Sequence, residues 1–306
     1  MWENVLFVFV MQENSSLDCL RDFVPIPAPE SGDTHPMAYD TLAIKDHGAV
    51  RRILLARPGQ RNAQSQQMLD ELMAALDDAQ RDDAVRVVVL GGQGAHFSAG
   101  HDLKQAQAER ANFTVEERWA YEELRYFDYS LRIWDFPKPT IAQVQGACVA
   151  GGFMIANMCD LVVAGESAFF SDPVGHTLGA AATEVLIHPW VMGARKAKEM
   201  LFTGGRIGAR EAQAIGMVNR VVADEELPDA ALAMAQQIAK APPFGLRLIK
   251  RSINRSLDAQ GLRTALQAHF DTHQLSHLSE GFLTARDRGL ASAIQKNTDT
   301  KTEKAA

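Results

Sequence analysis

Two glycine-containing segments, residues 97–103 and 146–152, have the composition needed to place backbone donors around one oxygen atom. Their sequences are FSAGHDL and GACVAGG. Each follows an apolar run that is typical of a strand, and each leads into a stretch that is typical of a helix. Two such turns can direct two backbone N–H groups at a single oxygen, and fixed donors of this kind stabilise negative charge as it develops. The pattern therefore predicts a site that stabilises an oxyanion.

The elements that must position these turns alternate along the chain. Apolar runs predict strands at 49–56, 87–90, 140–144, 161–164, 168–170 and 217–222. Apolar residues at helical spacing predict a helix after residue 62 and further helices at 194–201 and 209–215. Asp102 begins another helix and forms with Gln105 a pattern that resembles a capping box. After Glu225 almost every residue falls in a helical pattern. The fold class expected is therefore α/β, followed by a helical region.

Composition narrows the classes of function. The chain has 306 residues, of which 46% are hydrophobic, and its net charge is −7. Because an acidic chain repels phosphate backbones, we expect no nucleic acid as the main partner. Three cysteines without a CxxC pair argue against a disulfide framework or a zinc site and suit a reducing cytoplasm. The apolar run near the N-terminus is too short to span a bilayer, so we expect no membrane partner.

The N-terminal part differs in composition from the rest. It combines this short apolar run with a Pro-rich, acidic stretch that is typical of a disordered linker. We expect three parts: a disordered extension at 1–36, a core at 37–225, and a helical region at 226–306.

The two glycine segments, preceded by Arg57-Pro58 and Asn62-Ala63 after a strand, resemble the enoyl-CoA hydratase/isomerase (crotonase) superfamily. The resemblance implies a spiral of ββα units with a helical C-terminal region that serves oligomerisation, commonly as a trimer or a dimer of trimers. It implies an acyl-CoA thioester substrate in lipid or aromatic acid metabolism. CoA would arrive with the substrate, and no metal or other cofactor is implied.

The resemblance also assigns roles to individual residues. The backbone N–H groups of His101 and Gly151 would form the oxyanion hole that stabilises a thioester enolate. Substrate or CoA contacts would come from Arg57, Ala99, Gly100, Asp102 and Lys296. For Asp102, the position before a helix favours an N-cap role instead. Basic residues of the C-terminal region, Arg247, Lys250, Arg251 and Arg255, would face the CoA phosphates.

The chain departs from the resemblance at the two glutamates that the hydratases use as acid and base. The first falls on Met154, and the second falls on Pro173 or Val174, none of which carries a proton. Asp172 and His176 are the substitutes expected from the sequence, as a carboxylate–imidazole pair. Glu184 and His188 follow in the same stretch, and their spacing does not show which way they face.

The expected function is therefore an acyl-CoA enzyme that stabilises an enolate. Isomerisation, or hydrolysis of a C–C or thioester bond, suits a site without the glutamate pair better than hydration does. A true hydratase with other residues and a non-catalytic acyl-CoA-binding scaffold remain the alternatives.

Overall fold

The computed structural model describes residues 39–292. The extension expected at 1–36 and the candidate Lys296 lie outside these residues.

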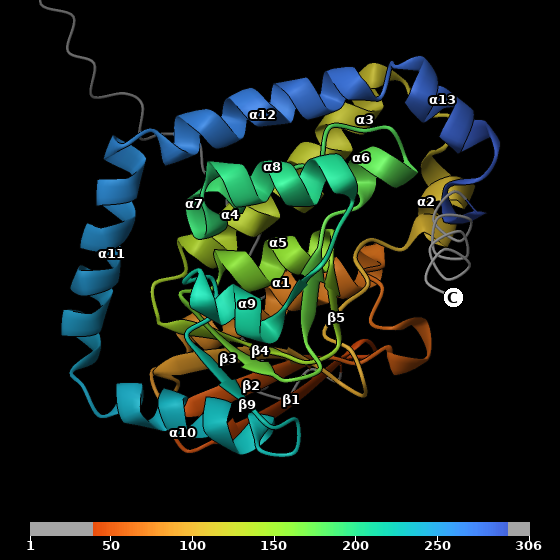
Figure 1. Ribbon diagram of the computed structural model, residues 1–306. Coiled ribbons are helices and arrows are strands. Elements are labelled where there is room, and N and C mark those ends of the chain that lie inside the picture. The colour runs from red at the N-terminus through yellow and green to blue at the C-terminus, as the bar shows by residue number, and fades with distance from the viewer. Residues whose placement is uncertain (1–38, 293–306) are drawn as a thin grey trace, which may run out of the picture. The chain divides into compact units, whose positions relative to one another are not determined.

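A six-stranded sheet forms one layer of the described part, with the strand order β1-β2-β3-β4-β6-β9 (Figure 1). β1 is antiparallel to β2, and the other neighbours are parallel. A second sheet has the order β5-β7-β8. The strands are β1 (Leu42–His47), β2 (Val50–Leu55), β3 (Val87–Gly92), β4 (Thr140–Val144), β5 (Ala147–Val149), β6 (Leu161–Gly165), β7 (Phe169–Ser171), β8 (Ile207–Gly208) and β9 (Arg220–Val222).

Helices connect the strands and make up most of the C-terminal part. They are α1 (Gln66–Arg81), α2 (Leu103–Arg110), α3 (Val115–Glu122), α4 (Asp128–Trp134), α5 (Gly151–Met158), α6 (Val174–Thr177), α7 (His188–Met192), α8 (Ala194–Thr203), α9 (Ala209–Ala214), α10 (Leu227–Ala239), α11 (Pro243–Ala259), α12 (Leu262–Ser276) and α13 (Glu280–Asp287). A 3₁₀ turn, Pro58–Gln60, follows β2, and a π-helical turn, Glu123–Phe127, joins α3 to α4.

The central strands β3 and β4 of the main sheet are buried on both faces, as their continuous apolar runs predict for parallel strands. Along β3, Val88 and Leu90 belong to the large core under α1, α4 and α5, whereas Val87 and Val89 face the other way. That second face is covered by α10, whose Leu227 packs there. The sequence predicts the end of the core at residue 225, which assigns α10 to the helical region. In the structure α10 packs on the main sheet of that core.

Most expected elements are present, with differences at some of their ends. The strand expected at 217–222 begins only at Arg220, because Met217 and Val218 bend into the core at the end of α9. Asp102 is the N-cap of α2 and accepts the N–H of Gln105 at 3.2 Å. The capping box is not completed, since the Gln105 side chain instead accepts the N–H of Gln66.

The end of β3 allows no side chain at Gly92. A Cβ there would lie 2.4 Å from the carbonyl oxygen of His96 and 2.5 Å from that of Phe97. Both contacts are with backbone, which cannot move aside without shifting the loop that follows. This close approach fixes the path of the chain into the first glycine segment.

We predict that Gly92→Ala lowers the free energy of unfolding by about 1–3 kcal/mol, as overpacking of a tight site does. Gly59→Ala is the matched control, because a Cβ at Gly59 meets no atom within 4 Å. Its stability should stay within about 0.5 kcal/mol of the parent. Urea denaturation measures both variants, and equal stabilities would contradict the packing argument.

Candidate oxyanion site and its buried charge cluster

Backbone pairing brings the two glycine segments together. Ser98 forms a parallel bridge with Cys148. In this bridge the Ser98 N–H donates to the carbonyl of Ala147, and the Val149 N–H donates to the carbonyl of Ser98, each at 3.0 Å. One residue earlier, the Phe97 N–H donates to the carbonyl of Gln145 at 2.8 Å. The first segment is therefore held along residues 145–149, which include β5 at the start of the second segment.

On its other side the first segment is held by Gln64. The Gln64 N–H donates to the carbonyl of Gly100 at 2.8 Å, and its own carbonyl accepts the N–H of Asp102 at 3.0 Å. Gly100 has φ +92° and comes so close to the second segment that a Cβ would lie 3.2 Å from the nitrogen of Gly151. His101 lies between Gly100 and Asp102, the two residues that bond to Gln64. Its backbone N–H is therefore next to the start of α5.

Two backbone donors remain without acceptors at this junction. Within residues 39–292, neither the His101 N–H nor the Gly151 N–H has a hydrogen-bond partner. Gly151 is the first residue of α5, where the helix dipole favours negative charge. Ala150, just before it, has φ +48°, a strained value for a residue with a side chain. The arrangement can hold one oxyanion between two donors.

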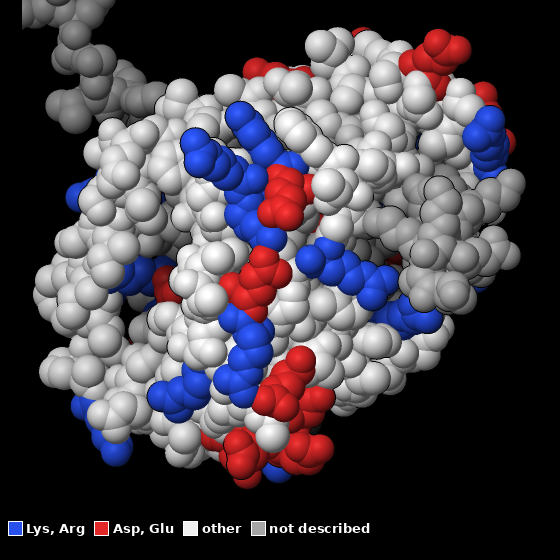
Figure 2. Space-filling view, viewed as in Figure 1, with Lys and Arg blue, Asp and Glu red and all other residues white. Residues whose placement is uncertain are grey.

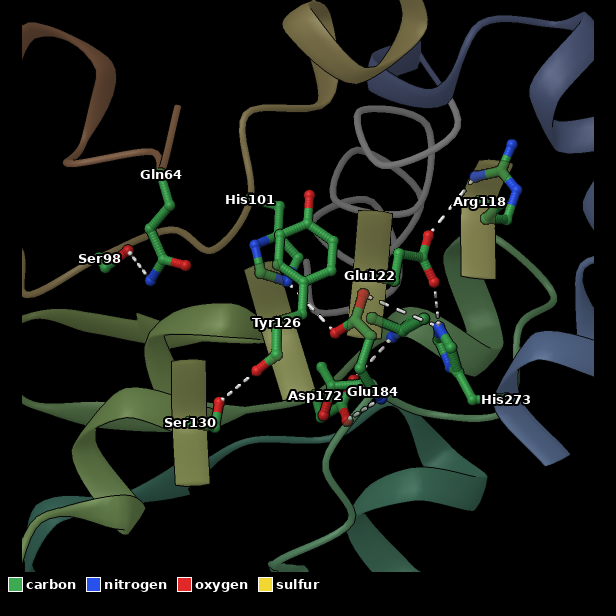
Figure 3. A network of polar contacts seen from close by, with 12 residues as sticks. Gln64, Ser98, His101, Arg118, Glu122, Tyr126, Ser130, Asp172, Glu184 and His273 are labelled. Carbon is green, nitrogen blue, oxygen red and sulfur yellow. Dashed lines mark hydrogen bonds and ion pairs between the residues drawn. The ribbon is translucent and has the colours of Figure 1, made fainter. Parts of the chain in front are cut away.

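The His101 side chain lies at the same place. Its ring stacks on Tyr126 with centroids 3.7 Å apart, and its Nε2 lies 3.2 Å from Oε2 of Glu184 (Figure 3). The other nitrogen, Nδ1, is buried and has no hydrogen-bond partner. A Cβ on Gly151 would lie 2.9 Å from this Nδ1. The unpartnered nitrogen therefore sits beside the second oxyanion donor.

Glu184 determines which nitrogen of His101 carries the proton. The Glu184 side chain is only 8% exposed. Burial would raise the pKa of this carboxyl, but the charge and hydrogen bond of His101, together with the charge of His273, lower it overall. Because a carboxylate only accepts hydrogen bonds, Nε2 of His101 must be the donor. In the neutral imidazole, Nδ1 is then free to accept a proton.

Charged groups continue behind Glu184, as Figure 3 shows. Nε2 of His273 lies 3.7 Å from Oε1 of Glu184 and 3.6 Å from Oε2 of Glu122. Arg118 pairs with the other oxygen of Glu122 at 3.5 Å, and the Gln274 amide donates to Oε2 at 2.7 Å. We call Glu122, Glu184, His273 and His277 the buried cluster. Sequence reasoning missed Glu122, His273 and His277, although the four-residue spacing of His269, His273 and His277 was available as a signal.

The structure pairs Asp172 with His188 rather than with His176. Both side chains of this pair are fully buried, and Nε2 of His188 lies 3.1 Å from Oδ2 of Asp172. Burial would raise the pKa of Asp172, but His188 and the backbone N–H groups of Val174 and Thr183 lower it. His176 is exposed on α6, and its Nε2 contacts the carbonyl of Phe202. The printed ion pair of Asp172 is thus with His188, and the catalytic pair of Asp172 with His176 stays a prediction.

Asp172 instead holds the segment that carries Glu184. Its Oδ2 accepts the N–H of Thr183 at 3.0 Å, while the carbonyl of Thr183 lies 2.8 Å from Nε2 of His269. Thr183 is thus fixed on both sides, which places the neighbouring Glu184 beneath His101.

The other residues proposed for CoA binding have partners within the protein. Arg57 forms an ion pair with Asp102 at 3.0 Å and donates to the carbonyl of Ala63. The Ala99 N–H donates to the carbonyl of Arg61 at 2.9 Å. These contacts brace the first segment from the side opposite β5, and no described contact tests a CoA role for them.

The basic residues of α11 lie around a cavity of about 380 Å³ beside Asp135 and Arg263. Lys250 is buried there and pairs with Asp160 at 2.8 Å. Arg247, Arg251 and Arg255 also line this cavity. On the face shown in Figure 2, basic and acidic side chains lie intermixed rather than in one broad patch. Among the described helices, none is long and apolar enough to cross a membrane.

The structure also places the residues on which the resemblance puts the two hydratase glutamates. Met154 is buried within α5, one turn after Gly151. Pro173 and Val174 are partly exposed at the start of α6. The carboxylate that the structure does bring to the oxyanion donors is Glu184.

We predict that Asp172→Asn lowers the free energy of unfolding by about 3–5 kcal/mol, because one member of a buried pair is left without its counterpart. His176→Gln, at an exposed position, should change it by less than about 0.5 kcal/mol. Thermal and urea unfolding compare the two. An Asp172→Asn protein as stable as the parent would contradict the anchoring role.

The chain is similar to known proteins of one family. The model of the enoyl-CoA hydratase/isomerase family matches residues 45–284. The protein EchA13 of Mycobacterium tuberculosis is 44% identical over 263 residues, covering 80% of this chain and 82% of the relative. 4-Chlorobenzoyl coenzyme A dehalogenase-2 of an Arthrobacter species is 33% identical, covering 69% and 77%. The crystal structure of a probable enoyl-CoA hydratase from Mycobacterium smegmatis is similar with a TM-score of 0.74 at 44% identity, covering 78% of this chain and 95% of that one.

These similarities confirm the α/β fold class expected from the sequence. Because the family match extends through most of the described residues, the two glycine segments and the buried cluster all lie within it or next to its boundaries. The chain belongs to the enoyl-CoA hydratase/isomerase (crotonase) family of acyl-CoA-processing enzymes.

Proposed function

We propose that this protein forms the enolate of an acyl-CoA thioester and moves a proton with the imidazole of His101. The single observation that carries the proposal is the position of His101. Its backbone N–H lies at the predicted oxyanion hole, and its unpartnered Nδ1 lies beside Gly151 while Nε2 is held by Glu184.

The proposed step uses only groups of the chain and the substrate. The thioester carbonyl oxygen accepts from the N–H groups of His101 and Gly151. Nδ1 of His101 takes the proton from the α-carbon, and the electron pair of that C–H bond moves onto the carbonyl oxygen. Glu184 stabilises the imidazolium that forms, as a carboxylate does for a histidine base. Return of the proton to a different carbon completes an isomerisation.

The absent glutamate pair supports isomerase or hydrolase chemistry over hydration. Water addition in hydratases uses two carboxylates, and the resemblance puts their positions on Met154 and on Pro173 or Val174. The relatives include a probable enoyl-CoA hydratase and a dehalogenase, so more than one reaction is named among similar chains. Hydration with the His101–Glu184 pair activating water is the second candidate, because this pair can also take a proton from water.

We predict that His101→Ala and Glu184→Gln each slow proton exchange at the α-carbon by about a hundred- to ten-thousandfold, the usual cost of losing an acid–base group. His101→Ala keeps the backbone N–H, so acyl-CoA binding should change little. The assay incubates a panel of acyl-CoAs with the protein in D₂O and follows deuterium uptake by mass spectrometry. Crotonyl-CoA in the panel also reports hydration.

His176→Gln is the informative comparison, because it removes the proton carrier proposed from the sequence. It should retain parent exchange rates. If His176→Gln lost exchange while His101→Ala kept it, the assignment to His101 would be wrong. Binding without exchange or turnover on any acyl-CoA would favour the non-catalytic scaffold.

We also propose that copies of this chain associate through α11. Four apolar side chains along it are exposed: Phe244, Leu248, Ile249 and Ile253. Since contiguous exposed apolar surface of this kind marks contact surfaces, a second copy is the natural occupant in a family that commonly forms trimers.

We predict that Ile253→Asp shifts the protein toward the monomer, because a charge would have to be desolvated in the contact. Ile215→Asp, at a less exposed position near the end of α9, is the control and should keep the parent's mass. Size-exclusion chromatography with light scattering measures both. An Ile253→Asp protein with the parent's oligomer mass would contradict the role of α11.

A further inference from the structure

Three members of the buried cluster carry ligand atoms that converge. Glu122 is the last residue of α3, His273 lies in the last turn of α12, and His277 is the residue that ends α12. All three are buried, with 6%, 2% and 8% of their surface exposed. One ligand atom from each lies within 4.8 Å of the other two. Two chain segments far apart in sequence therefore meet in a group of two imidazoles and a carboxylate.

The spacing of these atoms is close to that of a coordination shell. Oε2 of Glu122 is 3.6 Å from Nε2 of His273 and 3.8 Å from Nδ1 of His277. Tetrahedral coordination at bond lengths near 2.0–2.2 Å separates ligand atoms by about 3.4 Å. Oε1 of Glu184 lies 3.7 Å from Nε2 of His273 but does not belong to the group of mutually close ligand atoms. Shortening the two Glu122 distances by about 0.2–0.4 Å would match the tetrahedral spacing.

The imidazole of His277 has unused bonding capacity. Nδ1 of His277 is buried without a hydrogen-bond partner, while the ring of His273 lies 3.6 Å and 3.7 Å from Glu122 and Glu184 and interacts with the carbonyl of Ala181. Buried polar atoms without a partner are uncommon and costly, and a bound cation would satisfy the imidazole nitrogen. Glu122 is already oriented, because the Gln274 amide donates to its Oε2 at 2.7 Å. Hydrogen bonds of this kind usually support metal-ligating carboxylates.

The charged side chains around the imidazoles are compatible with a bound cation. Glu122 pairs with Arg118, and Glu184 lies near His273, so two carboxylates and one guanidinium surround the imidazoles. His269, one turn earlier on α12, is different, since its Nε2 lies 2.8 Å from the carbonyl of Thr183. Of the three histidines spaced four residues apart, His273 and His277 therefore belong to the group of ligand atoms and His269 does not.

We propose that Glu122, His273 and His277 bind a divalent transition-metal ion of the Zn²⁺ class, with water completing the shell. This site lies outside what the family resemblance implies, which includes no metal. It does not depend on the proposed proton transfer by His101. The same cluster without an ion would be a protonated His273 between two carboxylates, and the experiment separates these two states.

The test uses the full chain without a histidine tag, stripped with a chelator and dialysed against Zn²⁺ or Co²⁺. We expect one equivalent of Zn²⁺ per chain by elemental analysis, and visible absorption of four-coordinate Co²⁺. His277→Gln and Glu122→Gln should weaken Zn²⁺ binding in calorimetry by more than about tenfold, since changes even to groups that only orient ligands cost this much. His269→Gln should bind like the parent.

Two results would overturn the proposal. The first is less than one equivalent of Zn²⁺ bound to the parent protein, a result that requires no variant. The cluster would then be explained by a protonated His273 between two carboxylates. The second is unchanged Zn²⁺ affinity in folded His277→Gln and Glu122→Gln proteins, which places the ion elsewhere. Circular dichroism establishes that each variant is folded. Loss of α-proton exchange in His101→Ala bears on the proposed function alone and not on the metal.

Discussion

The pairing of the first glycine segment with β5, inside the second segment, is the constraint on which the site depends. Residues 97 and 98 bond to the chain at 145–149, and Gln64 holds the same segment from the other side. These bonds are between backbone groups, so they fix where the His101 and Gly151 N–H groups point whatever the side chains are. The tight contact at Gly100 follows from this pairing, because the two segments approach more closely there than a side chain permits.

A second constraint is electrostatic. Glu184, Glu122 and Asp172 are all buried, and an isolated buried carboxylate is costly. Each has a basic neighbour: His101 and His273 for Glu184, Arg118 for Glu122, and His188 for Asp172. Removing one partner from such a pair costs more than the pair itself contributes. Burial of these charges therefore argues for positioning of specific groups rather than for added stability. In the case of Glu184, the group positioned is the imidazole next to the oxyanion donors.

The sequence predicted the parts that depend on local patterns. Apolar runs located β2, β3 and β4, and helical spacing located α1, because burial repeats along an element at its own period. The N-cap role of Asp102 also followed from its neighbours in the chain. The two glycine segments were recognised from their residues, although only the backbone bonds between them bring them together.

The parts that the sequence did not predict depend on contacts between distant segments. His176 is closer in sequence to Asp172 than His188 is, yet the turn of α6 leaves His176 exposed while α7 buries His188 against Asp172. Glu184 faces His101 because Thr183 is bonded on both sides, which no local spacing encodes. Glu122 lies at the start of a π-helical turn, an irregularity that helical periodicity does not predict and that often occurs at functional sites.

A crystal structure of the protein with a bound acyl-CoA tests the central claim most directly. The account predicts the thioester oxygen about 2.7–3.1 Å from both the His101 and the Gly151 nitrogens. It also predicts Nδ1 of His101 about 3–3.5 Å from the α-carbon, a distance suited to reaction. A thioester bound away from these two nitrogens, or an α-carbon that faces another proton carrier, would contradict it.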